Sequence, residues 1–354
     1  MSAELVEQYQ EILPLETHCP LCRRPSSRSD ATSEHIIPAW LQTRLSLRDR
    51  LLTLPNGRRR HYRSVRVDIC SACNNQRFSQ LENRLTRIWD RCACDESSFY
   101  DASFEIADDD VAAWLGKMFW LLARLGFETP DPTTRNAECV DTVVPQDLMP
   151  FMTWLGLYVA SYALEKRALS CYSDDTADPA NYGRSYSLYR FRIDDQGQPI
   201  ERFNLIDHYL SMGIAMRLGD LGLVCLYDDE LHARWRSAYY ADLSSTWVHS
   251  VQFSEIVARM FYDQLMLHPL ARDFTPFWNS SLDAVITCNG FKRGADPYWG
   301  LSDDPDLYAD MLNRVMPDGT HAQIERVGDQ FTTFLRDRAG NLWDVVNNCP
   351  RSTA

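Results

Sequence analysis

The sequence predicts an α+β protein in which a small, basic, cysteine-rich segment precedes a larger body with helical and strand patterns. Three observations support this fold class: two Cys-x-x-Cys pairs near the start, a charge that changes sign along the chain, and apolar residues spaced both by two and by three to four. We expect two domains, residues 1–100 and residues 101–354, the second mostly helical with antiparallel strands.

The charge is divided unevenly along the chain. Residues 18–91 contain 15 arginines and 6 acidic residues, a net charge of +9, whereas residues 101–354 carry −16. A basic segment joined to an acidic body is typical of a protein that binds a polyanion through the basic part alone. A solvated surface in which arginine is preferred over lysine would give the same composition.

We expect no membrane or secretory segment. The chain starts with a polar, acidic stretch, and the best apolar candidate, residues 111–125, is interrupted by Lys117 and Arg124. A bilayer-spanning helix needs about 18 or more apolar residues. Eleven cysteines without a secretory leader indicate a reducing cytoplasm, where paired cysteines hold metal more often than they form disulfides.

The larger body has its own helix and strand signals. Three acids, Asp108 to Asp110, precede an apolar run and suit the positive end of a helix. Gly219-Asp220 is typical of a tight turn between two strands. We expect helices at residues 111–125, 148–171, 254–267 and 307–315, a strand at 187–194, and two strands within 213–229.

Four cysteines form the two pairs, Cys19 with Cys22 and Cys70 with Cys73. Together they supply the tetrahedral set of thiolates that a structural zinc ion prefers. The 47 residues between Cys22 and Cys70 exclude a simple zinc finger. The alternative is four unrelated buried thiols.

The segments between and after the cysteines show clear periodicity. Residues 64–70, SVRVDIC, alternate polar and apolar and predict a strand with one buried face. Residues 74–91 place apolar residues three and four positions apart and predict an amphipathic helix with Asn74 at or just inside its start. A first strand should carry Glu34 and His35.

Glu34, His35 and Asn74 together suit hydrolysis of a phosphodiester. Glu34 and Asn74 offer hard oxygen atoms to a divalent cation such as Mg²⁺. His35 can take a proton from water near neutral pH. A cation beside a base is a general means of cleaving such a bond, because the base activates water and the cation stabilises the leaving oxygen.

The cysteine pairs, the stretch Glu34-His35-Ile36-Ile37-Pro38 and the run Cys70-x-x-Cys73-Asn74-Asn75 resemble the HNH endonucleases with a zinc-binding cysteine quartet. The resemblance covers residues 17–92 and implies a ββα-metal (treble-clef) fold. It implies that His35 is the general base, that Glu34 and Asn74 hold the catalytic cation, and that Arg77 contacts the scissile phosphate.

The chain departs from this family at one position. The family's middle asparagine, which orients the histidine through a backbone contact, should lie about nine residues before Asn74, where this chain has Val65. We expect another contact to replace it, for instance from the insertion at residues 39–64. The same insertion contains a tight Asn56-Gly57 turn.

An arginine cluster follows that turn and suits binding to a nucleic-acid backbone. An exposed edge strand protected by charge is the alternative. The arginines are Arg58, Arg59, Arg60 and Arg63.

The sequence therefore predicts a metal-dependent nuclease, with DNA favoured over RNA as the substrate, and restriction or anti-phage defence as the biological setting. A protein or small-ligand regulator of residues 101–354 and a homo-oligomer are further expectations. The alternative is a non-catalytic zinc module that binds nucleic acid or protein and is attached to a ligand-sensing domain.

Overall fold

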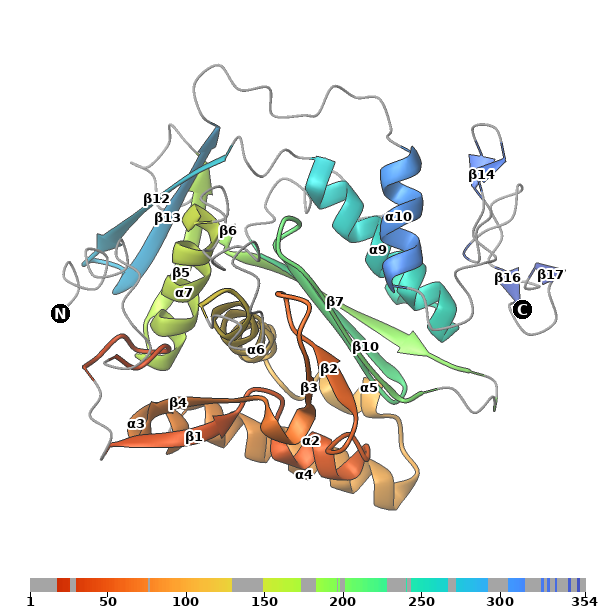
Figure 1. Ribbon diagram of the computed structural model, residues 1–354, viewed down its shortest axis with the longest axis horizontal. Helices are drawn as coiled ribbons and strands as arrows, with labels where there is room; N and C mark the ends of the chain where they lie inside the picture. Colours follow the sequence, from red (N-terminus) through yellow and green to blue (C-terminus); the bar gives the residue numbers. More distant parts are fainter. Residues whose placement is uncertain are drawn as a thin grey trace, which may run out of the picture. The chain divides into compact units, whose positions relative to one another are not determined.

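The protein is described by a computed structural model (Figure 1). Helices and strands are both present, which confirms the α+β class. No helix among the described residues is long and apolar enough to cross a membrane. The described residues are 18–25, 30–75, 77–128, 149–172, 183–195, 197, 201–227, 240, 243–266, 272–291, 305–315, 326–327, 330–331, 335, 343–344 and 349–350.

Contacts divide the chain into two compact units. The first comprises Met1–Ser97, Phe104–Tyr186 and Arg272–Lys292, and the second comprises Ser98–Ser103, Ser187–Ala271 and Arg293–Ala354. Residues 104–186 and 272–292 therefore group with the cysteine-rich segment by their contacts. The expectation that residues 1–100 form the functional module stays a prediction.

The first unit begins with a two-stranded antiparallel ladder. Strand β1 (Ala31–His35) pairs with β4 (Arg66–Cys70), and His35 lies opposite Arg66. Because side chains alternate across a strand, one face of β4 is buried and the other carries exposed polar groups. The intervening insertion forms α2 (Ala39–Arg44), the hairpin of β2 (Leu51–Thr53) and β3 (Arg59–His61), and a short 3₁₀ helix, η1 (Tyr62–Ser64).

Two helices follow the ladder, α3 (Ser71–Asn75) and α4 (Arg77–Asp95). The expected amphipathic helix is confirmed, because Phe78, Leu81 and Leu85 are buried along one side of α4. Asn74 lies in the short helix α3, just before the amphipathic helix rather than inside its start.

The rest of the first unit consists of two long helices and a four-stranded sheet. Helix α6 (Asp108–Glu128) starts at the three predicted acids, and Asp110 accepts a hydrogen bond from the hydroxyl of Tyr162 at 2.6 Å. Helix α7 (Met149–Ala163) follows. The sheet order is β12-β13-β5-β6, formed by Arg272–Asn279, Ala284–Phe291, Arg167–Tyr172 and Gly183–Arg184.

The predicted helix at residues 148–171 is wrong in its last third. The helix ends at Ala163, and Glu165 has a φ of 59°, a left-handed value that breaks helical geometry. The chain then forms β5, which is parallel to β13. Pairing with a strand more than 100 residues away overrides the local helical pattern.

The second unit contains a five-stranded sheet in the order β11-β7-β10-β9-β8. The predicted strands are confirmed, and Gly219, with a φ of 64°, lies in the turn between β9 and β10. The strands are not all antiparallel as expected, since β11 is parallel to β7. They are Tyr186–Ile193 (β7), Phe203–His208 (β8), Gly213–Leu218 (β9), Leu221–Tyr227 (β10) and Trp247–Val248 (β11).

Helices α9 (Ser250–Met266) and α10 (Pro305–Val315) form a core with this sheet, close to where the sequence predicts them. A Cβ atom added to Gly222 would lie 2.6 Å from the Phe253 ring, so glycine allows α9 to approach the sheet closely. Smaller elements are α5 (Phe99–Ser103) and the strand pairs β14 (Arg326–Val327) with β15 (Gln330–Phe331), and β16 (Trp343–Asp344) with β17 (Cys349–Pro350).

Candidate functional site

The four predicted cysteines converge. The Sγ atoms of Cys19, Cys22, Cys70 and Cys73 all lie within 4.8 Å of one another, and those of Cys22 and Cys70 are 3.7 Å apart. A tetrahedral zinc ion with bonds of about 2.3 Å places its sulfur ligands about 3.8 Å apart. The quartet therefore has the donor type and the spacing to hold a metal ion.

Both cysteine pairs are shaped by their local backbone. Cys19 and Cys22 lie in a turn in which Arg23 has a φ of 60°, and the amide of Cys70 donates to Cys19 Sγ at 3.4 Å. Helix α6 also holds this turn, because the indole of Trp120 donates to the Pro20 carbonyl at 2.8 Å. The quartet is thus part of the core of the first unit.

The crowding of the thiols changes their acidity. Hydrogen bonds from Cys22 and Cys73 lower the pKa of Cys19 to about 2, because they stabilise its thiolate. The pKa of Cys22 is raised to about 12 and that of Cys73 is raised further, first through their hydrogen bonds to Cys19. Four thiolates at this spacing repel one another, so a bound cation would favour ionisation of the whole quartet.

His35 lies on the exposed face of the β1–β4 ladder, in contact with Arg66. The Nε of Arg66 donates to His35 Nε2 at 3.0 Å and also to the Arg63 carbonyl at 3.1 Å. Because Nε2 accepts, the neutral ring carries its proton on Nδ1. Burial is the main cause that lowers the pKa of His35, followed by the charge of Arg66; Glu34 opposes them.

A residue of the insertion also contacts His35. A hydrogen bond to the backbone of Arg63 raises the pKa of His35 and partly offsets the burial. Arg63 belongs to η1, at the end of the insertion, while Val65 is fully buried in the core. Arg48, also in the insertion, is close enough for its charge to act on the imidazole.

Glu34 points to the opposite face of β1 and is bound by a buried lysine. Lys117 Nζ donates to Glu34 Oε1 at 2.7 Å and to Glu82 Oε1 at 2.9 Å. The Lys117 side chain is only 2% exposed. Burial raises the pKa of Glu82, and the nearby ammonium of Lys117 opposes this shift.

Asn74 lies on the same side of β1 as Glu34. Its Nδ2 donates to Thr32 Oγ1 at 2.9 Å, while the Thr32 hydroxyl donates to the Ile69 carbonyl at 3.2 Å. Because that hydroxyl has already used its proton, it must accept from Asn74, and the Oδ1 of Asn74 remains available for a cation. Thr32 and Glu34 are two residues apart on one strand face, about 7 Å.

The predicted site residues are therefore only partly brought together. Glu34 and Asn74 share one face of β1, whereas His35 lies on the other, and Glu34 is already paired with Lys117. The backbone of Arg77 begins α4, and its side chain lies outside what the structure describes.

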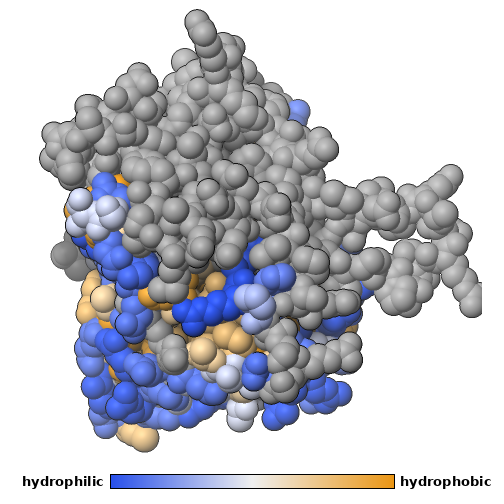
Figure 2. Space-filling model, turned by 90° about the vertical axis from the view of Figure 1, so that its left-hand side faces the viewer, coloured by the Kyte–Doolittle hydropathy of each residue, from blue (hydrophilic) through white to orange (hydrophobic). Residues whose placement is uncertain are grey.

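The arginine cluster forms a hairpin on the first unit. Leu52 on β2 pairs with Arg60 on β3, and the Arg58 amide donates to Asn56 Oδ1 at 3.1 Å across the turn. Arg59 and Arg63 are exposed, while Arg58 and Arg60 are half-buried. Figure 2 shows mostly hydrophilic side chains over the end of the first unit that carries β1 and β4.

Sequence reasoning missed Arg66, Arg48, Lys117 and Glu82. The sequence predicts the two strands but not their pairing, and it is the register of that pairing that places Arg66 opposite His35. Lys117 and Glu82 have no local signal, because Lys117 lies 83 residues from Glu34 in the sequence.

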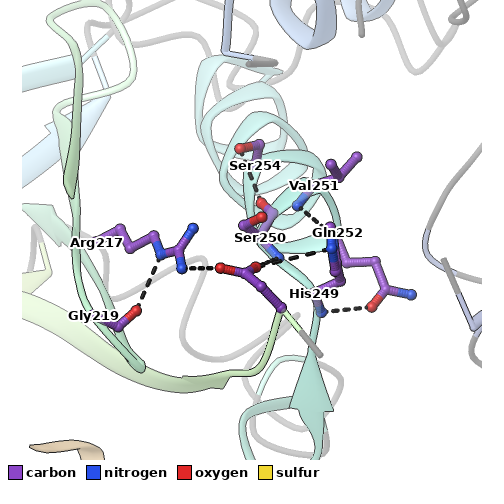
Figure 3. Close-up of polar contacts among 8 residues, drawn as sticks. Arg217, Gly219, His249, Ser250, Val251, Gln252 and Ser254 are labelled. Carbon is purple, nitrogen blue, oxygen red and sulfur yellow. Dashed lines mark hydrogen bonds and ion pairs between the residues drawn. The ribbon is translucent and has the colours of Figure 1, made fainter. Parts of the chain in front are cut away.

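A second polar cluster, in the second unit, has the residue types of a hydrolase triad (Figure 3). His249 Nε2 is 3.9 Å from Asp195 Oδ1, and Ser250 follows in sequence. However, His249 Nδ1 accepts from the Val251 amide at 3.2 Å, so it cannot take a proton from Ser250. The His249 amide donates to Gln252 Oε1 at 2.8 Å, which completes a reciprocal cap at the start of α9.

Asp195 in this cluster also has a structural role. It forms an ion pair with Arg217 and accepts from the Ser250 amide at 3.2 Å. It thereby ties the end of β9 to the start of α9.

No protein-family model, curated protein or solved structure matches this chain. The case for function therefore depends on the geometry of the first unit.

Proposed function

We propose that the protein is a metal-dependent nuclease of the HNH type, with a ββα-metal (treble-clef) module built on a structural zinc ion at the cysteine quartet. The observation that carries the proposal is the contact between His35 and Arg66. A candidate base and a candidate phosphate-binding group lie within hydrogen-bond distance, on the exposed face of a strand whose other face offers oxygen ligands.

His35 would act as the general base. Its Nδ1 carries the proton in the neutral ring, so Nε2 is the atom that would accept a proton from water once Arg66 moves to a phosphate oxygen. A guanidinium binds a phosphate more strongly than a neutral imidazole, because the pair is charge-assisted.

Glu34 and Asn74 would hold the catalytic cation, Mg²⁺ or another divalent ion, and Arg77 would contact the scissile phosphate. The donors fit such an ion, because both offer oxygen and Thr32 turns the amide so that its Oδ1 remains available. Such a cation would lie on the face of β1 opposite His35, where it would neutralise phosphate charge when bound. The hairpin residues Arg58, Arg59, Arg60 and Arg63 would bind the backbone of the substrate.

Side-by-side cleavage of single- and double-stranded DNA and RNA, with Mg²⁺, Mn²⁺ or Ni²⁺, tests this proposal. We expect cutting by the wild type, DNA preferred, and loss of about 10²- to 10⁴-fold in His35→Ala. His61→Ala is the matched control, because His61 is exposed and its Nδ1 faces the Asp49 carbonyl at 2.8 Å. Equal rates in the wild type and His35→Ala would refute the nuclease proposal.

A second candidate is a non-catalytic zinc module that binds nucleic acid or protein. The pairing of Glu34 with Lys117 favours it, because that carboxylate already has a counter-charge. Tight, salt-dependent binding without cleavage would support this alternative.

The biological setting stays a prediction. Four reduced thiols suit a cytoplasmic protein. Restriction or anti-phage defence, a homo-oligomer, and a regulator bound by residues 101–354 are expectations that the same preparations can test.

A further inference from the structure

Lys117 is a buried cation placed directly beside the proposed site. Its ammonium donates to Glu34 on β1 and Glu82 on α4, and it lies 5.3 Å from the centroid of the Phe78 ring. Two carboxylates and an aromatic face thus surround it, with helix α6 as the source of the lysine.

Stability alone does not account for this arrangement. A buried ion pair costs about as much in desolvation as it gains in attraction, and well-packed apolar residues often replace it without loss. The surroundings are strongly apolar, with Trp114, Met118 and Leu121 all buried on α6. Lys117 has two specific partners, and one of them, Glu34, adjoins the candidate base in the sequence.

We propose that Lys117 is a positioning residue of this site. It fixes Glu34 on the face of β1 that also carries Asn74, and Glu82 fixes Lys117 in turn. The inference rests on the proposed nuclease function. It makes α6, which lies beyond the residues that resemble the HNH family, a necessary part of the nuclease site.

The geometry explains how the lysine would act. Its bond falls on Glu34 Oε1 and restrains the carboxylate, so Oε2 would be the oxygen offered to a cation. With both carboxylates ionised, the cluster of Lys117, Glu34 and Glu82 has a formal charge of −1. Lys117 therefore also reduces the negative charge that attracts a divalent ion to the face shared with Asn74. Residues that orient metal ligands typically change metal affinity or activity by about 10- to 100-fold when removed.

Two variants separate positioning from charge, because the second has the cluster charge of the wild type. Glu82→Gln keeps an acceptor oxygen for Lys117 and leaves the lysine on Glu34. Lys117→Met combined with Glu82→Gln removes the lysine, avoids an unpaired second carboxylate, and restores the wild-type cluster charge of −1. Both variants should retain the bound zinc and melt within a few degrees of each other.

Two readouts test the proposal: Mn²⁺ binding followed by electron paramagnetic resonance, and the kcat and KM for DNA cleavage. We expect Glu82→Gln, in which Lys117 keeps its bond to Glu34, to lose less Mn²⁺ affinity and less kcat than the double variant. The double variant should bind Mn²⁺ at least about tenfold more weakly and lose a similar factor in kcat, with KM for DNA unchanged.

The outcomes distinguish this inference from the proposed function. If the wild type cuts DNA and the double variant binds Mn²⁺ and cuts as the wild type does, Lys117 is not a positioning residue, although the nuclease proposal stands. If the wild type neither cuts nor binds Mn²⁺, both proposals are wrong. Should the double variant lose zinc or unfold, Lys117→Arg with Glu82→Gln replaces it, and unchanged Mn²⁺ affinity and kcat there overturn the requirement for the lysine's point charge.

Discussion

The Nε of Arg66 lies 3.0 Å from His35 Nε2 and donates a hydrogen bond to it, so the lone pair that the proposed general base would use is covered in this structure. Arg66 is exposed, which leaves its guanidinium free to turn toward a phosphate. We infer that substrate binding and uncovering of the base are coupled.

Arg66→Gln tests this coupling. It removes a charge-assisted contact to phosphate, worth about 1.5–3 kcal/mol, so KM for DNA should rise by about 10- to 100-fold. On a small activated phosphodiester such as bis(p-nitrophenyl) phosphate, kcat should not fall, because the base is no longer covered. A kcat that falls on both substrates while KM stays constant would show that Arg66 acts in another way.

The pH profile of cleavage follows from the environment of His35. Burial and the charge of Arg66 lower the pKa of His35 below its usual 6.5, so the imidazole stays neutral and able to accept a proton at lower pH. The rate should rise with pH through a midpoint below pH 6.5 and then stay level, as far as this group is concerned.

Arg66→Gln should shift that profile. Removal of a neighbouring positive charge makes protonation easier, so the pKa of His35 should rise and the rising limb should move to higher pH. Measuring kcat/KM from about pH 5 to 9 for both proteins tests the direction. A limb that moves to lower pH, or does not move, contradicts the assignment of His35 as the base.

Much of the site could be predicted because its signals are local. The cysteine pairs, the alternation of residues 64–70 and the helical spacing after Cys73 each depend on neighbours in sequence, and the structure confirms the elements they indicate. The same reasoning located Asn74 and the hairpin turn at Asn56.

The remainder depends on contacts between distant segments. Lys117 occurs in an apolar run and has the appearance of an interruption in a core helix; only the folded chain shows that Glu34 and Glu82 surround it. Likewise, residues 167–171 continue a helical pattern but pair with β13, which lies far along the chain. No periodicity encodes such partners.

Cys70→Ser tests the metal centre. The quartet holds the first pair of cysteines against the end of β4, so loss of one thiolate should release the metal and destabilise the first unit. Structural zinc contributes on the order of 10 kcal/mol to small modules, so a loss of most bound zinc and a large drop in melting temperature are expected.

Cys94→Ser is the control, because Cys94 is exposed and lies outside the quartet. Zinc content measured by atomic emission and melting measured by circular dichroism compare the two. A Cys70→Ser protein that keeps its zinc and its melting temperature would mean that the four thiols are merely neighbours.

The arginine hairpin should dominate backbone binding. Replacing Arg58, Arg59 and Arg60 together with glutamine removes three positive charges from the hairpin, so the affinity for DNA should fall. The slope of log Kd against log salt concentration should also decrease, by the equivalent of up to about three phosphate contacts. The effect should be similar for different DNA sequences, because backbone contacts carry no base information.

The matched control removes the same three charges from α4. Arg84 and Arg91 on that helix already pair with Asp110 and Glu105, and the Nε of Arg87 donates to the Asn83 carbonyl. Changing these three residues to glutamine lowers the net charge equally, so it should leave the salt dependence nearly intact. A filter-binding titration compares the two triple variants. Only a specific contact surface would distinguish two variants of equal charge. If both weaken DNA binding alike, net charge rather than the hairpin governs the interaction.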